Sequence, residues 1–74
     1  MVNKVIKVAL DNGQCNVSTN FTVKAISLEE CNETLDYIID KGYTIISCNI
    51  TKVSSTSWLF DIKGVIKKGG INGI

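Results

Sequence analysis

One stretch of the chain predicts its structure more clearly than any other, namely ISLEECNETLDYIIDKG, residues 26–42. Ser27 and Glu30 have the spacing of a capping box, in which each side chain accepts a hydrogen bond from the other residue's backbone N–H. We therefore expect a helix that begins at Leu28 and ends before Gly42, since glycine favours the position after a helix. Apolar residues recur at intervals of three and four and would form one stripe: Leu28, Cys31, Leu35, Ile38 and Ile39.

The segments on both sides of this helix are rich in β-branched and aromatic residues, which are typical of strands. Residues 2–10 and 15–26 are separated by Asn12-Gly13, and Asn-Gly is the strongest short-range hairpin signal. Residues 43–53 and 58–67 flank four hydroxyl residues, which predicts a second hairpin. The predicted fold class is α+β: a ββαββ two-layer α/β sandwich, with one helix packed on a four-stranded, mainly antiparallel sheet.

The chain has 74 residues, enough for one domain. We assign residues 1–68 to a single ββαββ domain and residues 69–74 to a Gly-rich C-terminal tail. A chain of this size buries only about 60% of its unfolded surface. Its one small core contributes little stability, so association with a second subunit would stabilise it.

Period-two alternation assigns the strand residues to two faces of the sheet. The face under the helix would hold Ile6, Val8, Leu10, Val17, Phe21, Val23, Ile46, Cys48, Ile50, Trp58, Phe60, Ile62 and Ile66. The opposite face would hold a mixture: Val5, Ala9, Tyr43, Ile45, Leu59 and Val65 with Lys7, Asp61 and Lys63.

A contiguous apolar patch on a sheet usually marks an interface, and no proline in this chain blunts a sheet edge. We therefore predict self-association through the mixed face or an open edge. The predicted interface or ligand-binding residues are Val5, Lys7, Tyr43, Ile45, Leu59, Asp61, Lys63, Lys67 and Lys68.

The composition argues against catalysis. The chain lacks histidine, the side chain whose unperturbed pKa lies near neutrality, and arginine, which binds phosphates through paired hydrogen bonds. Cys15, Cys31 and Cys48 are odd in number and widely spaced, so they predict neither a disulfide framework nor a zinc site. We expect no enzyme, no cofactor and no metal.

The expected function is that of a small non-catalytic binding protein, a homo-oligomer. Abundant Lys, Asn and Ile without Arg is typical of an AT-rich genome, and the chain resembles in composition the small inhibitors made by phages and mobile elements. This resemblance implies a protein that sequesters a host defence factor or a nucleotide signalling molecule. A chain without a leader or an apolar run of about 18 residues predicts a cytoplasmic protein that contacts no membrane.

The alternative is a single-stranded nucleic-acid-binding module on the open face of the sheet. Tyr43 would stack on a base, and Lys7 or Lys63 would contact phosphates. The net charge of only +1 and the dispersion of the eight lysines make nucleic acid the less favoured partner.

Overall fold

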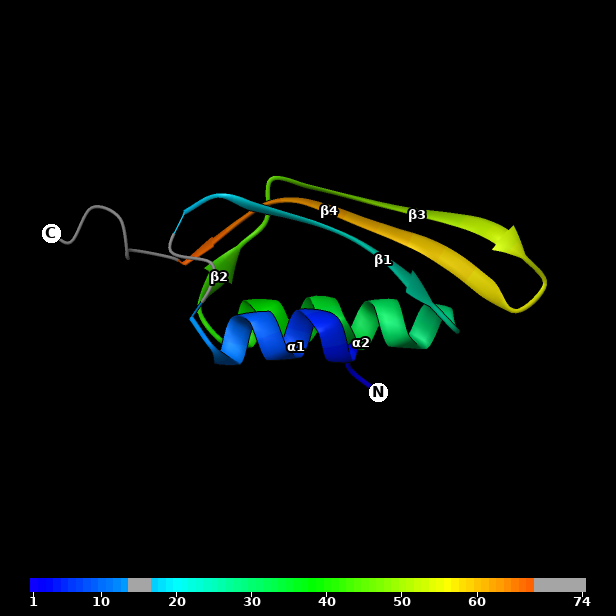
Figure 1. The fold of residues 1–74 in the computed structure, drawn as a ribbon, viewed down its shortest axis with the longest axis horizontal. Helices are drawn as coiled ribbons and strands as arrows, with labels where there is room; N and C mark the ends of the chain where they lie inside the picture. Colours follow the sequence, from blue (N-terminus) through cyan, green and yellow to red (C-terminus); the bar gives the residue numbers. More distant parts are fainter. Residues whose placement is uncertain (14–16, 68–74) are drawn as a thin grey trace, which may run out of the picture.

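The computed structural model describes residues 1–13 and 17–67 (Figure 1). Two helices lie on one face of a four-stranded antiparallel sheet, so the α+β class is confirmed. The order of elements is αβαβββ and not the predicted ββαββ: α1 (Lys4–Asp11), β1 (Thr19–Ala25), α2 (Leu28–Asp40), β2 (Tyr43–Thr44), β3 (Ser47–Ser54) and β4 (Ser57–Lys67).

Strand β4 is the centre of the sheet, because each of the other three strands pairs with it. β1 runs along one side of β4, with Val23 opposite Phe60. β3 runs along the other side, with Ile50 opposite Phe60. The short β2 pairs with the end of β4, and a two-residue turn joins β3 to β4, which confirms the second predicted hairpin. Both β1 and β3 are therefore edge strands within the described part of the chain.

The first element is the helix α1, where we predicted a strand. Ile6, Ala9 and Leu10 are buried, and their spacing of three and four places them on one helical face. Asn3 caps the helix, since its Oδ1 accepts hydrogen bonds from the backbone N–H groups of Val5 (3.1 Å) and Ile6 (3.3 Å). The β-branched residues of this segment also fit a strand, so only packing against the core separates the two conformations.

Asn12-Gly13 ends α1 and does not form the predicted hairpin. Gly13 has φ +70°, and its N–H donates to the Leu10 carbonyl at 3.0 Å. A type I′ turn and a helix C-terminus both need a residue with positive φ. The same dipeptide therefore suits both structures.

Helix α2 begins at the predicted residue and Ser27 caps it, but Glu30 accepts from the N–H of Ile26 and not from that of Ser27 as the capping box predicted. The Glu30 N–H donates to Ser27 Oγ (3.1 Å), and the Ile26 N–H donates to Glu30 Oε1 (3.2 Å). Cys31, Thr34 and Ile38 of α2 are buried against the sheet.

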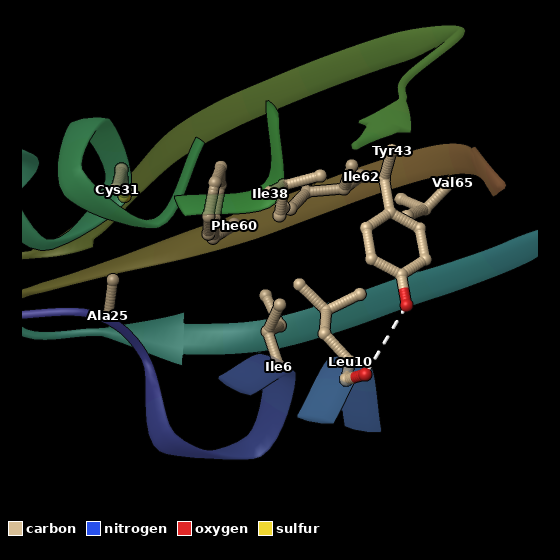
Figure 2. Close-up of a cluster of buried hydrophobic side chains, with 9 residues drawn as sticks. All are labelled: Ile6, Leu10, Ala25, Cys31, Ile38, Tyr43, Phe60, Ile62 and Val65. Atoms are coloured by element: carbon tan, nitrogen blue, oxygen red, sulfur yellow. Dashed lines mark hydrogen bonds between the residues drawn. The ribbon is translucent and has the colours of Figure 1, made fainter. Parts of the chain in front are cut away.

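The core lies between the two helices and the sheet (Figure 2). Figure 2 shows the side chains of α1 on the β1 side of β4 and those of α2 on the β3 side. The Tyr43 hydroxyl donates a hydrogen bond to the Leu10 carbonyl across this core (3.3 Å). The buried cluster is Ile6, Leu10, Ala25, Cys31, Ile38, Tyr43, Phe60, Ile62 and Val65.

A bulge at Gly64 changes the face on which the end of β4 presents its side chains. β4 contains one more residue than β1 between the pairs Phe21–Ile62 and Thr19–Val65, and Gly64 has φ +73°. Such a bulge typically uses a glycine with positive φ. Val65 therefore joins Ile62 in the core, and simple alternation placed it wrongly.

Other assignments to the two faces were also wrong. Ala9 and Tyr43 are buried, although we placed them on the uncovered face. Phe21 and Val23 pack against the core as expected. Five residues of the predicted core are exposed: Val8 on the outer side of α1, Val17 before β1, Ile46 between β2 and β3, and Cys48 and Ile50 on the edge strand β3.

Candidate interaction surface

The nine residues predicted to form an interface lie in different parts of the molecule. Val5 and Lys7 are exposed on α1, in the helical layer and not on the sheet. Tyr43 is 6% exposed, and Ile45 packs against the core. Lys67 is the last residue of β4, and Lys68 is outside the described residues, as is the predicted tail 69–74.

Leu59, Asp61 and Lys63 do share one surface, the face of the sheet that the helices leave open. Asp61 lies between Thr22 of β1 and Asn49 of β3, and the Thr22 hydroxyl donates to Asp61 Oδ1 at 3.1 Å. The other strand residues around them are polar: Asn20, Lys24, Ser47 and Thr51. This open face is therefore largely polar and lacks the contiguous apolar patch that we predicted.

Strand β3 is exposed along its whole length. Its helix-side positions Cys48 and Ile50 are exposed, although the β4 residues opposite them, Ile62 and Phe60, are fully buried. The cover that the helices provide therefore ends at β4. Figure 1 also shows the β3–β4 hairpin extending beyond the start of α2. The outer backbone groups of such a strand can pair with a further strand.

An apolar stripe lies on the side of α2 that faces away from α1. The α2 residues that bond to Asn3 of α1, Glu30 and Thr34, lie on the side of α2 that faces α1. At 3.6 residues per turn, Leu28, Leu35 and Ile39 fall on the opposite side, towards β3. Leu28 is 50% and Ile39 62% exposed, and Leu35 is partly buried. We call β3 together with Leu28, Leu35 and Ile39 the β3–α2 surface.

Two cysteines lie near this surface. Cys31 is buried in α2, and burial raises the pKa of its thiol. Cys48 is on the exposed strand β3, where partial desolvation by its neighbours and the nearby Asp61 carboxylate raise the pKa of its thiol. Because the thiolate is the nucleophile, a raised pKa makes both groups less reactive near neutral pH.

A polar cluster joins the C-terminal ends of the two helices. The Asp11 carboxylate accepts hydrogen bonds from Lys7 Nζ (2.8 Å) and from the Tyr37 hydroxyl (2.5 Å). Lys7 Nζ lies 5.7 Å and Lys41 Nζ 5.2 Å from the centroid of the Tyr37 ring. Each of these groups has a partner within the cluster, so we assign it to holding α1 against α2.

Asn3 is a second junction, which the sequence analysis missed. It is 7% exposed, its N–H donates to Thr34 Oγ1 (2.8 Å), and its Nδ2 donates to Glu30 Oε2 (2.8 Å). One side chain thus caps α1 and ties it to the first turns of α2. An Asn three residues before Ile6, the first residue of the apolar spacing Ile6, Ala9 and Leu10, was the signal that could have revealed it.

The described residues contain no cluster of three or more His, Cys, Asp or Glu side chains that could hold a metal ion. Within residues 1–13 and 17–67, no helix has the length and apolar character needed to cross a membrane. No protein-family model, curated protein sequence or solved structure matches this chain.

Proposed function

We propose that the protein is a non-catalytic binding protein that acts through the β3–α2 surface. The observation that carries this proposal is that all eight residues of β3 are exposed, whereas Phe60 and Ile62 on the adjacent strand are fully buried. An exposed edge strand of this length is an aggregation hazard, because its unpaired backbone N–H and C=O groups can pair with other chains. A partner that pairs with this strand would remove the hazard.

The character of the surface favours a protein as the partner. The β3–α2 surface offers backbone hydrogen-bonding groups and apolar side chains, and its one cation, Lys52, lies 5.7 Å from the centroid of the Trp58 ring. Helix α2 adds the exposed acids Glu29, Asp36 and Asp40. Such a surface suits β-strand addition better than it suits an anionic nucleotide. A phage or mobile-element origin, and a host defence factor as the target, remain predictions from composition.

The nucleic-acid alternative is less well supported, because it needs Tyr43 to stack on a base. The Tyr43 ring is buried, and its hydroxyl donates to the Leu10 carbonyl. Single-strand binders combine a basic groove with exposed aromatic rings. The described residues of the open face include Lys24 and Lys63 but no aromatic side chain.

Native mass spectrometry of protein purified from its natural host tests the proposal. We expect wild type to appear in a complex that Ile50→Lys abolishes, because an unpaired ammonium is costly in an apolar contact. Val8→Lys, an equally drastic change on the exposed side of α1, should preserve the complex. A wild-type protein found only as a monomer, or a complex lost equally in both variants, would contradict the proposal.

A further inference from the structure

We propose that a second copy of this chain occupies the β3–α2 surface, with the two β3 strands paired antiparallel about a two-fold axis at Asn49. This inference rests on the proposed function and names its partner. It joins the two sheets into one continuous sheet, with the α2 helices side by side beneath it.

Pairing geometry limits where the axis can lie. Residues directly opposite each other in antiparallel strands point to the same face of a sheet. A symmetric pair of identical strands must therefore have its axis at a residue and not between two residues. The regular part of β3, before the shift in its register with β4, runs from Ser47 to Lys52. Asn49 and Ile50 are the two residues at its centre.

Side-chain chemistry favours Asn49. With the axis there, Cys48 lies opposite Ile50 of the second copy on the helix side, and Ser47 lies opposite Thr51 on the open face. Apolar residues then meet apolar residues, hydroxyls meet hydroxyls, and no charged residue of these five faces the other strand.

With the axis at Ile50, each Lys52 would instead lie opposite Cys48 of the second copy. That pairing would draw a charged group into the apolar side of the contact and away from the Trp58 ring, from which Lys52 Nζ now lies 5.7 Å. The axis at Asn49 leaves both lysines at the outer ends of the paired segment.

The α2 stripe supplies the additional area that a dimer needs. A stable interface takes about 800 Å² from each copy, roughly a sixth of the 4808 Å² accessible surface of this chain. One eight-residue strand falls short of this. Asn49 is opposite Asp61, between Phe60 and Ile62, and Figure 2 shows Ile38 of α2 beside these two residues. The middle of the α2 stripe therefore lies near the axis.

The other edge of the sheet is a poorer candidate. The helix-side residues of β1, namely Thr19, Phe21, Val23 and Ala25, are all at least partly buried. A second copy at β1 would therefore gain less from covering side chains.

Disulfide crosslinking tests the axis. In a Cys15→Ser, Cys48→Ser background, Asn49→Cys would place two thiols directly opposite each other, with Cβ atoms about 5 Å apart. Oxidised glutathione should then link the two chains rapidly. Thr22→Cys is the matched control, since Thr22 lies opposite Asp61 from the other edge. It should form no such dimer.

Mixing two single-cysteine variants tests the register of the paired strands. Ser47→Cys and Thr51→Cys should each crosslink poorly alone but should form a heterodimer when mixed. A dimer that crosslinks through Ile50→Cys or Thr22→Cys, and not through Asn49→Cys, would overturn the inference.

Light scattering on purified wild-type protein gives an independent measurement. We expect twice the chain mass for wild type and Val8→Lys, and the mass of one chain for Ile50→Lys with an unchanged circular dichroism spectrum. A wild type that stays monomeric at all concentrations would overturn the dimer. The proposed function would still stand if native mass spectrometry found a β3-dependent complex with a different molecule.

Discussion

The two edge strands of the sheet, β1 and β3, are alike in their pairing with β4 but differ in burial. β1 and β3 pair antiparallel with opposite sides of β4, so Val23 and Ile50 both lie beside Phe60 on the helix side. Val23 packs against the core, whereas Ile50 is 36% exposed. Side chains of α1 lie on the β1 side of β4 (Figure 2), and among the described residues α2 is the one helix on the β3 side. The position of a helix, and not the type of residue, decides which edge is covered.

The largest expected difference in the free energy of unfolding is between a truncation in the central strand β4 and one in the open edge strand β3. Phe60→Ala should lower the free energy of unfolding by about 3–5 kcal/mol, because it removes a fully buried ring. Ile50→Ala should cost about 1 kcal/mol or less in dilute protein, since this side chain is already partly in water. Urea denaturation of both variants gives the comparison. Equal losses would show that β3 is covered like β4.

Gly64 sets the face on which the end of β4 presents its side chains. Gly64→Ala should cost about 1–3 kcal/mol from the positive φ alone. A Cβ at Gly64 would also come within 2.5 Å of the Ile46 side chain, which adds to the cost. Gly13→Ala has a similar φ but no atom within 4 Å, so thermal denaturation should show a smaller loss there. The Ile46 Cβ would itself lie 2.7 Å from the new Cβ, so only Ile46→Gly removes the whole contact. If Ile46→Gly restores nothing to Gly64→Ala, the contact contributes little.

Loss of the α1 cap should weaken the cover that α1 gives to β1, so that β1 becomes more exposed, as β3 is. Asn3→Ala removes the Oδ1 acceptor for two N–H groups and the Nδ2 bond to Glu30, at a cost of about 1–2 kcal/mol, whereas the bond from its backbone N–H to Thr34 remains. Ser27→Ala, the cap of α2, should cost about 0.5–2 kcal/mol. Hydrogen exchange should accelerate in β1 and not in β3 when Asn3 is changed. Equal acceleration in both strands would contradict the separate cover of the two edges.

The smallest expected effect is a dependence on acid pH at the α1–α2 junction. Hydrogen bonds from Lys7 and then from Tyr37 lower the pKa of Asp11. The folded state therefore gains stability above the ordinary carboxyl range and loses it as pH falls through this lowered pKa. Asp11→Asn and Lys7→Gln should each reduce the slope of stability against pH in acid titrations. An unchanged slope in both variants would exclude a contribution from this ion pair.

Local signals were reliable where one short-range pattern had one structural solution. The capping box of Ser27 and Glu30 located the start of α2, and the run of hydroxyl residues located the β3–β4 turn. Sequence patterns that fit two structures led to wrong predictions. Asn12-Gly13 suits a hairpin and a helix end, and the residues before it suit a strand and a helix.

The candidate surface was harder to predict than the fold. An open edge was expected from the absence of proline, but the residues chosen for it depended on alternation. Alternation failed at α1, where the period is 3.6, and after Gly64, where one inserted residue reverses the faces. The β3–α2 surface was missed because Cys48 and Ile50 have the pattern of core residues.

The sequence by itself determined helix α2, the strand character of β1, β3 and β4, and the lack of histidine and arginine for catalysis, because these depend on composition or on neighbours within about four residues. Tertiary structure alone decided that residues 4–11 are a helix, that Tyr43 and Val65 are buried, and that β3 is exposed. A helix as short as α1 is stable only when its apolar face is buried. The burial of β1 depends on that helix, whereas within residues 1–13 and 17–67 α2 leaves β3 exposed.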